Sequence, residues 1–109
     1  MKGVGIDIEE IARFSEKKYD KNKLFYKKIF TDSEIEFCLN QVEPYQHFTA
    51  RFCAKEAAIK AVSDKNLKFT EIEVSKNKNK PILNIPNEKN VIVSISHTRK
   101  YATAVVIIF

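Results

Sequence analysis

The sequence is poor in glycine and contains no tryptophan. Its two glycines, Gly3 and Gly5, stand near the beginning, so both the G-x-x-x-x-G-K-[ST] and the G-x-G-x-x-G phosphate-binding loops are excluded. Cysteine is also scarce, and Cys38 and Cys53 have neither a C-x-x-C spacing nor a zinc-site spacing. Both thiols fall in helix-like patterns and are expected to be buried. Any bound anion must therefore be held by side chains or by a metal.

The chain also lacks a long apolar run. The longest one, residues 104–109, is far too short to span a bilayer. Asp7 and Glu9 interrupt the beginning of the chain, so no charged region followed by a long apolar stretch opens it. The sequence predicts a cytoplasmic protein without a membrane partner.

Length and charge limit the classes of protein that remain. A chain of 109 residues with 44% hydrophobic content predicts one domain, residues 1–109, with a modest core. Association with further copies would be a natural source of extra stability. The net charge of +5 and the pI near 9.2 favour an anionic partner. Nucleic acid, a phosphorylated ligand and an acidic protein all fit that charge.

The first half of the chain begins with a strand and continues with helices. The patterns predict a strand, a short helix and a long helix, at residues 4–9, 31–40 and about 47–63. The period of two in the strand puts Asp7 and Gly5 on one face. Thr31 and Glu34 form a capping box at the start of the short helix, and Pro44 separates the two helices.

In the second half of the chain, apolar residues recur at every second position. The alternation predicts several strands, around residues 72–74, 82–83, 91–96 and 101–109. The connection at residues 97–100 is short enough for a hairpin, so these strands are expected to be antiparallel. A strand, two or three helices and then a meander predict an α+β domain with helices packed on a mainly antiparallel sheet.

The long helix has an apolar side with two charges at its margins. Phe52 and Ile59 lie on the apolar side, and Lys55 and Glu56 flank it. A carboxylate near an apolar core is costly unless a cation meets it, so Glu56 needs a partner. Together with Asp7 it makes a sparse oxygen set that suits Mg²⁺, which keeps several waters and takes phosphate oxygens from a substrate. A solvated Asp7 on a strand face is the other interpretation.

Three cations of this helix are also informative. Lys60 follows Glu56 by four residues, which predicts either a surface ion pair or a cation placed over a metal-bound phosphate. Arg51 and Lys55 have the same spacing, and two like charges four residues apart repel. This pair is easier to explain if an anion or an acid lies nearby.

Two polar segments in the second half have open interpretations. Ser96, His97 and Thr98 close an otherwise apolar strand, either for local turn chemistry or as a polar rim that grips a phosphate or ribose. Lysines alternate over residues 76–80 in a loop before Pro81, and such a loop is often only solvated.

Five segments together resemble the holo-acyl-carrier-protein synthases, of the 4′-phosphopantetheinyl transferase superfamily. They are, in order, GVGIDIEEIARF (3–14), IFTDSEIEFCL (29–39), ARFCAKEAAIKAV (50–62), NKP (79–81) and SISHT (94–98). GIDI and ARFCAKEAAIKA form the signature pair of the family. One departure is Asn79, which stands where the family usually has glycine, so asparagine must accept a positive φ there.

The resemblance implies a reaction. The 4′-phosphopantetheine arm of coenzyme A is transferred to a serine of an acyl carrier protein, adenosine 3′,5′-bisphosphate is released, and fatty acid biosynthesis is supported. Asp7 and Glu56 are implied to hold Mg²⁺ against the coenzyme A pyrophosphate, and Lys60 to contact phosphate. We hypothesise that Glu56, directly or through a water, also accepts the serine proton. Glu56 and Lys60 are thus the candidate catalytic residues.

The resemblance also implies where coenzyme A and the carrier bind. Arg51, His97 and Thr98 are similar to residues that hold the adenosine 3′-phosphate region. The full set of candidate coenzyme A contacts is Arg51, Lys60, Lys80, Pro81, Ser96, His97 and Thr98. Arg13 is expected to help dock the acidic carrier. Members of the family are trimers, so a homotrimer with each site between two protomers is expected.

Two other functions compete with this one. A basic nucleic-acid-binding domain would place cations and exposed aromatics on one sheet face. The strands after residue 69 instead carry Glu71, Glu73 and Ser94, and Glu56 would have no role. No nucleic-acid partner is therefore expected. A module that binds coenzyme A or a carrier without turnover is the third possibility.

Overall fold

The chain folds around one long helix, α4 (Pro44–Val62). The other elements are β1 (Gly3–Glu10), α1 (Ala12–Ser15), η1 (Tyr19–Lys21), α2 (Lys23–Lys27), α3 (Asp32–Leu39), η2 (Phe69–Glu71), β2 (Glu73–Asn77), β3 (Lys80–Asn84), β4 (Val91–His97) and β5 (Tyr101–Ile108). The structure is a computed structural model that describes residues 1–64 and 66–109.

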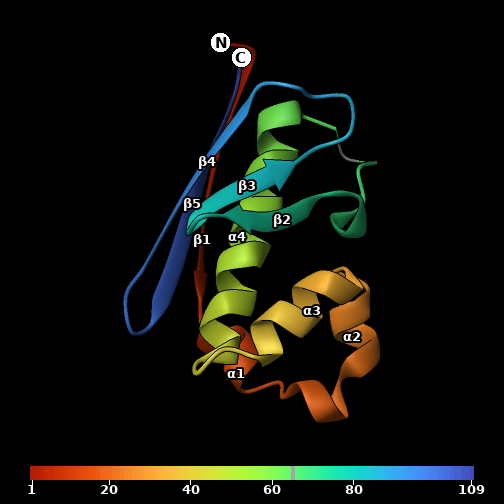
Figure 1. Cartoon of the computed structure of the whole chain (residues 1–109), viewed down its shortest axis with the longest axis vertical. Helices are drawn as coiled ribbons and strands as arrows, with labels where there is room; N and C mark the ends of the chain where they lie inside the picture. Colours follow the sequence, from red (N-terminus) through yellow and green to blue (C-terminus); the bar gives the residue numbers. More distant parts are fainter. Residues whose placement is uncertain (65) are drawn as a thin grey trace.

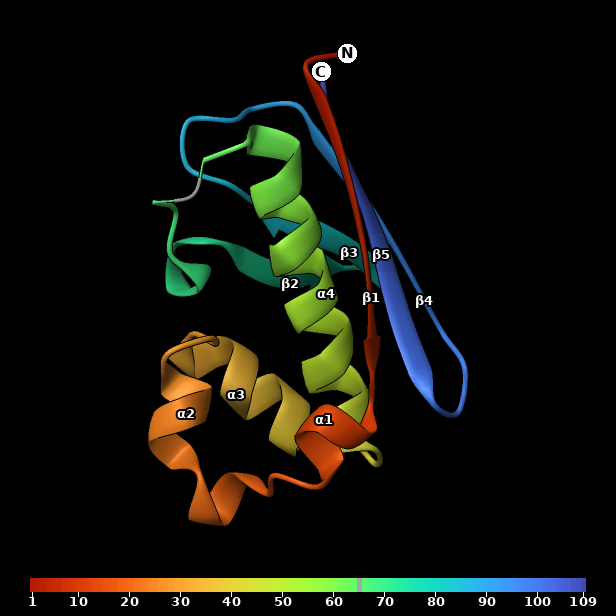
Figure 2. The same cartoon turned by 180° about the vertical axis from the view of Figure 1, so that it is seen from behind.

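The strands form two antiparallel sheets next to α4 (Figures 1 and 2). A three-stranded sheet of order β1-β5-β4 packs along one side of α4, and the β2-β3 hairpin crosses another side. Helices α1, α2 and α3 gather at one end of the molecule, and the two chain termini lie together at the other. This arrangement confirms the predicted α+β fold with helices on antiparallel strands.

The long helix begins earlier than predicted. Pro44 is in its first turn, so the expectation that Pro44 separates this helix from the preceding one is wrong. Proline fits there because the amide that it lacks would have no partner within the helix. The helix ends at Val62, and Ser63 follows in a left-handed conformation with a φ of 59°. In the described part of the chain, no helix is long and apolar enough to cross a membrane.

Strand β1 turns its small and acidic side toward α4. A Cβ atom on Gly5 would collide with the carbonyl oxygen of Ala57, so the strand can approach the helix this closely only with glycine. The predicted alternation is confirmed, and it puts Asp7 on the Gly5 face. The apolar residues of the strand lie on the opposite, exposed face: Val4, Ile6 and Ile8. The buried face of β1 is therefore the polar one.

Two groups of buried side chains form the core. In the first, alanines of α4 and β5 let the helix lie close to the sheet. The second is aromatic and holds the short helices against α4; it includes Phe14, Tyr26, Phe30, Phe48 and Phe52. Helices of four to eight residues are not stable alone, so their order depends on this packing.

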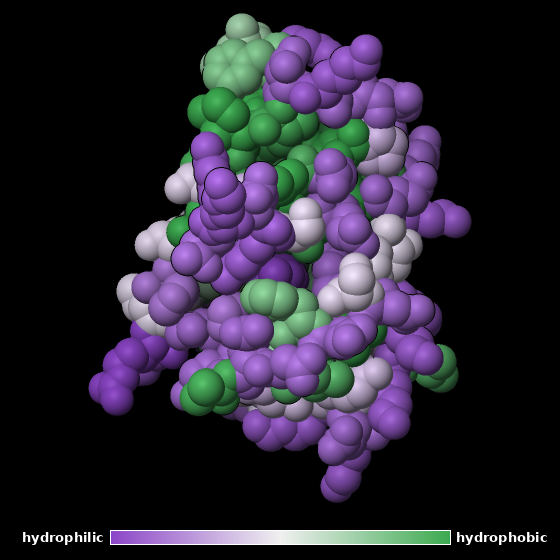
Figure 3. Space-filling view, in the orientation of Figure 1, coloured by the Kyte–Doolittle hydropathy of each residue, from purple (hydrophilic) through white to green (hydrophobic). Residues whose placement is uncertain are grey.

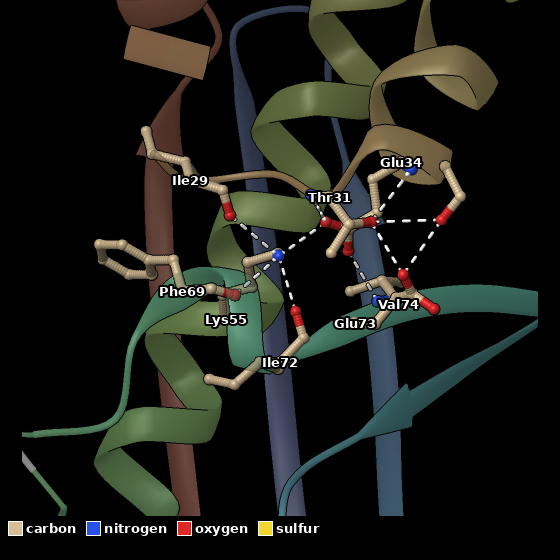
Figure 4. A network of polar contacts seen from close by, with 9 residues as sticks. Ile29, Thr31, Glu34, Lys55, Phe69, Ile72, Glu73 and Val74 are labelled. Carbon is tan, nitrogen blue, oxygen red and sulfur yellow. Dashed lines mark hydrogen bonds and ion pairs between the residues drawn. The ribbon is translucent and has the colours of Figure 1, made fainter. Parts of the chain in front are cut away.

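Helix α3 begins with the predicted capping box. The Thr31 amide donates to Oε1 of Glu34 at 2.8 Å, and the Glu34 amide donates to Oγ1 of Thr31 at 3.3 Å. The same carboxylate meets Nζ of Lys55 at 2.7 Å, and both side chains are fully buried (Figure 4). The prediction that Lys55 lies at the margin of the apolar side of the long helix is therefore wrong, because its side chain is fully buried. Glu34 is thus the acid that meets Lys55, whereas among the described residues no ion pair reaches Arg51.

The two hairpins agree with the sequence patterns. Residues 98–100 connect β4 to β5, as predicted. Between β2 and β3, Lys78 and Asn79 have φ values of 53° and 69°, which is the backbone that a two-residue hairpin turn needs. This confirms that Asn79 accepts a positive φ.

Both cysteines are buried free thiols, as predicted. Burial raises the pKa of Cys38 to about 12, and burial with the nearby Asp7 and Glu9 carboxylates raises the pKa of Cys53 to about 12. A thiol with such a pKa carries almost no thiolate near neutral pH. Neither cysteine is a candidate nucleophile.

Candidate active site

Asp7 and Lys60 meet at the β1 edge of the three-stranded sheet. Nζ of Lys60 donates to Oδ1 of Asp7 at 3.3 Å and to the carbonyl oxygen of Ile6 at 2.9 Å. The Asp7 side chain is 9% exposed, whereas that of Lys60 is 54% exposed. Oδ2 of Asp7 is buried and has no hydrogen-bond partner among the described residues. Because a buried carboxylate oxygen without a donor is unfavourable, this atom is open to a cation.

Glu56 lies one helical turn before Lys60 on α4 and is half-buried. Residues four apart share a helix face, so these two side chains leave α4 on the same side. Asp7 and Glu56 fit Mg²⁺, because both offer carboxylate oxygens and one oxygen of Asp7 lacks a partner. The described residues contain no cluster of three or more His, Cys, Asp or Glu able to hold a metal. Two carboxylates suit an ion that keeps several of its waters.

Arg51 belongs to a group of side chains around the ring of Phe37. Its Cζ lies 4.2 Å from the ring centroid, and Nζ of Lys76 lies 5.1 Å from the same centroid. The ring of His47 stands edge-on to Phe37, with 5.8 Å between the centroids. We call these four residues the Phe37 cluster. Arg51 is 4% exposed, and its Nε has no hydrogen-bond partner in the described part of the chain.

His47 of the Phe37 cluster is affected by burial and by neighbouring charges, including that of His97 at the end of β4. Burial lowers the pKa of His47, and the positive charges of Arg51, Lys76 and His97 lower it further. Arg51 and His97, which the motifs assigned to one phosphate, both act on His47. His47 and Lys76 were not assigned to this site, and nothing in their sequence positions indicated it.

The remaining predicted contacts lie on β3 and at the end of β4. Lys80 and Pro81 line a cavity between β3 and β4. Ser96 and His97 are exposed at the end of β4. Oγ1 of Thr98 accepts hydrogen bonds from two backbone amides of the following turn, at 3.3 and 3.1 Å. The local turn role considered for Thr98 is therefore present.

The predicted site residues form two groups at opposite edges of one sheet. Asp7 of β1 is joined there by Lys60 of α4, with Glu56 one turn earlier on α4, whereas Lys80, Pro81, Ser96, His97 and Thr98 lie on β3 and at the end of β4. Strand β5 runs between β1 and β4, and neighbouring strands are about 4.8 Å apart, so the edges are about 10 Å apart. The first group can hold a cation and a phosphate, and the second can hold a further anion.

The sequence matches the 4′-phosphopantetheinyl transferase superfamily over residues 3–106. The chain belongs to this superfamily. A holo-[acyl-carrier-protein] synthase from Chlamydia trachomatis is 42% identical over 98% of each chain. Another from Chloroherpeton thalassium is 43% identical over 96% of this chain and 95% of its own. The family resemblance found in the sequence motifs is confirmed.

Solved structures of the phosphopantetheinyl transferase superfamily share the fold. A Helicobacter pylori holo-[acyl-carrier-protein] synthase in complex with coenzyme A has a TM-score of 0.85 at 31% identity, over 97% of this chain and 99% of that one. A Bacillus anthracis holo-(acyl-carrier-protein) synthase in complex with CoA (3′,5′-ADP) also has a TM-score of 0.85, at 34% identity, over 98% of this chain and 95% of that one. The transferase fold is thus confirmed from sequence and from structure.

This phosphopantetheinyl transferase has a further acid near its site, Glu9, which the sequence analysis did not select. Its carboxylate accepts a hydrogen bond from Arg13 at 2.8 Å, and Cζ of Arg13 lies 4.8 Å from the centroid of the Phe52 ring. Burial and the neighbouring Asp7 carboxylate raise the pKa of Glu9. The period of two could have revealed this residue, because an acid two positions after Asp7 shares its face. Arg13, predicted to dock a carrier, is held in place but remains 54% exposed.

Proposed function

We propose that the chain transfers the 4′-phosphopantetheine group of coenzyme A to a serine of an apo-acyl carrier protein and releases adenosine 3′,5′-bisphosphate. One observation carries the proposal: the buried, unpartnered oxygen of Asp7 lies beside Lys60 in a chain 42% identical to a holo-[acyl-carrier-protein] synthase over 98% of its length. In this proposal residues 1–109 act as one domain in the cytoplasm, and the modified carrier serves fatty acid biosynthesis.

The group at β1 is proposed to carry out the chemistry. Mg²⁺ held by Asp7 and Glu56 would neutralise charge on the pyrophosphate of coenzyme A. Lys60 contacts Asp7 at a long 3.3 Å and is half exposed, so its ammonium is free to turn to a substrate phosphate. There it stabilises the charge that develops on the leaving bisphosphate. Glu56 accepts the serine proton while the serine oxygen bonds to phosphorus and the pyrophosphate bond breaks.

The group at β4 is proposed to hold the adenosine end of coenzyme A. The Arg51 guanidinium is buried and its Nε has no hydrogen-bond partner among residues 1–64 and 66–109, so its charge and its donor are available to a phosphate. Ser96, His97 and Thr98 present polar atoms at the end of β4. The cavity lined by Lys80 and Pro81 lies between β3 and the beginning of β4 and is proposed to accept the rest of the adenosine.

The carrier is proposed to dock near Arg13. Residues 17–28 contain six lysines and a single acid, Asp20, although the net charge of the whole chain is only +5. This segment follows α1 and includes α2, at the end of the molecule where hydrophilic side chains predominate in Figure 3. Such a concentration of positive charge would steer an acidic carrier toward the β1 edge.

We propose that the chain is a homotrimer in which two protomers complete each site. The two groups of site residues lie at opposite edges of the sheet, so the edge of one copy can meet the opposite edge of another. The outer face of the sheet carries exposed apolar side chains, namely Val4, Ile6, Ile8 and Ile92. A contiguous apolar face of this kind is unusual on a monomer.

A direct assay tests the transfer. Incubation of the chain with apo-carrier, coenzyme A and Mg²⁺ is expected to increase the carrier mass by one phosphopantetheine group, measured by mass spectrometry. Removal of the metal with a chelator is expected to stop the reaction, because two carboxylates would otherwise face the pyrophosphate. A carrier variant without the acceptor serine is the control. Absence of any mass gain with Mg²⁺ or Mn²⁺ would overturn the proposed function.

A substitution in the exposed sheet face tests the trimer. Ile6 is 64% exposed in the isolated chain, so Ile6→Glu places a charge in the proposed interface without touching the core. We expect the mass in analytical ultracentrifugation to fall from three chains to one, with loss of transfer activity. Val42→Glu is the matched control, since Val42 is 98% exposed and lies between α3 and α4. A parent chain that sediments as a monomer while active would contradict the shared site.

A further inference from the structure

The Phe37 cluster gathers basic side chains from different parts of the fold. Arg51 and His47 come from α4, Lys76 comes from β2, and the Phe37 ring that they contact comes from α3. Arg51 and Lys76 lie 4.2 and 5.1 Å from the ring centroid, and His47 meets the ring edge-on. An aromatic face attracts cations, which explains how one ring keeps two of them nearby.

The positive charge of the cluster is not balanced. Among the described residues, no ion pair reaches Arg51, Lys76 or His47. The groups whose charge acts on His47 are Arg51 from its own helix, Lys76 from β2 and His97 from β4, and no carboxylate of the described residues is among them. Arg51 is 4% exposed and its Nε lacks a partner. A buried guanidinium with an unused donor among other cations is a site built for an anion.

We propose that His47 and Lys76 join Arg51 and His97 in a proton-linked binding site for a phosphate monoester. The identity of that phosphate rests on the proposed function, in which Arg51 and His97 hold the 3′-phosphate of coenzyme A. His47 and Lys76 then determine how strongly the chain prefers a nucleotide with a 3′-phosphate to one without it.

The proton linkage follows from the charges. In the free protein, burial and the three neighbouring cations lower the pKa of His47 from its ordinary value, so His47 is neutral near pH 7. A bound phosphate dianion favours the imidazolium and raises that pKa, so binding takes up a proton. Affinity therefore rises as the pH falls from about 8 to about 6.5, and below about 6 protonation of the phosphate itself opposes the effect.

Calorimetry on the full chain tests this site with adenosine 3′,5′-bisphosphate as the probe. We expect the affinity to be about tenfold higher at about pH 6.5 than at about pH 8, the size of one charge-assisted hydrogen bond. The binding enthalpy should vary with the ionisation enthalpy of the buffer, which reports proton uptake. Adenosine 5′-monophosphate lacks the 3′-phosphate. Its binding should therefore show neither the rise in affinity at lower pH nor the proton uptake, apart from what the titration of its own 5′-phosphate contributes.

Variants separate the contributions of the two new residues. His47→Gln is expected to remove the pH dependence and to lower affinity at about pH 6.5 to the value at about pH 8. Lys76→Gln should weaken binding several-fold at both pH values, because it removes a cation that lies 5.1 Å from the centroid of the Phe37 ring. Lys78→Gln is the matched control, since Lys78 is exposed in the turn of the same hairpin. Lys76→Gln keeps the test decisive if His47→Gln folds poorly.

Three results would overturn the inference: no binding of the bisphosphate, an affinity independent of pH, or a pH dependence that survives in His47→Gln. The outcome is separable from that of the proposed function. A chain that modifies the carrier but binds the bisphosphate without proton uptake lacks this site. A chain that binds the bisphosphate with proton uptake but never modifies a carrier has the site and lacks the proposed activity.

Discussion

Replacement of Asp7 by asparagine is expected to reduce kcat/KM for carrier modification by about a hundredfold to a thousandfold, the effect of losing one preorganised electrostatic group. The same variant is expected to unfold at an equal or higher temperature than the parent. Oδ2 of Asp7 is buried and has no hydrogen-bond partner in the described part of the chain, so a neutral amide relieves an unfavourable burial. The substitution also weakens the 3.3 Å pair with the half-exposed Lys60, but such a pair contributes little to stability.

The opposite signs of these two effects distinguish a binding site from a structural one. If Asp7 only stabilised the fold, its replacement would lower activity and unfolding temperature together. In the presence of coenzyme A, added Mg²⁺ should raise the unfolding temperature of the parent further and leave that of Asp7→Asn unchanged, because a ligand stabilises only the state that binds it. Glu36→Gln is the control, since Glu36 is exposed on α3. An Asp7→Asn chain with near-normal turnover would remove Asp7 from the proposed metal site.

Local signals in the sequence determined most of the elements. The capping box at Thr31 and Glu34 fixes the start of α3 because both partners lie within four residues of each other. The four residues predicted between the last two strands, 97–100, are short enough for a hairpin, and the observed connection is the three residues 98–100. The start of α4 was misplaced because Pro44 was interpreted as a break, although proline is favoured in the first turn of a helix.

The orientation of β1 could not be predicted from its own pattern. Alternation gives the period of a strand but not which of its faces is covered. Here the backbone of α4 comes so near that only Gly5 fits on the covered face, and Asp7 is buried with it. The apolar side, which includes Ile6, is left exposed. A second copy of the chain, which a single sequence does not reveal, is the proposed reason for this arrangement.

The site was predicted in part. Family motifs selected Asp7 and Lys60, and the structure brings these two side chains together. They did not select His47 or Lys76, because each reaches the site through a tertiary contact with Phe37 and has no motif of its own. Contacts between distant elements depend on packing, and no spacing in the sequence encodes them.

Replacement of Lys55 by methionine is expected to lower the free energy of unfolding by about 3–5 kcal/mol, the usual effect of breaking a buried ion pair. Lys55 and Glu34 are both fully buried, and Nζ lies 2.7 Å from Oε1. Nζ also donates to the carbonyl oxygens of three residues from two other segments: Ile29, Phe69 and Ile72 (Figure 4). Burial lowers the pKa of Lys55, and the Glu34 carboxylate opposes that shift, so the pair depends on both partners. Urea-induced unfolding measures the loss.

The double variant Glu34→Gln with Lys55→Met shows how much of that loss of stability comes from leaving the charged Glu34 carboxylate without its cation. Without Lys55, the Glu34 carboxylate keeps backbone donors at Thr31 and Val74 but has no buried cation, so a neutral glutamine should recover part of the stability. Recovery should be incomplete, because the three carbonyl oxygens still lack a donor. Lys27→Met is the control: Lys27 is an exposed lysine of α2, so this variant should change the free energy of unfolding by less than about 0.5 kcal/mol. Additive losses in the double variant would mean that the two side chains stabilise the core independently of each other.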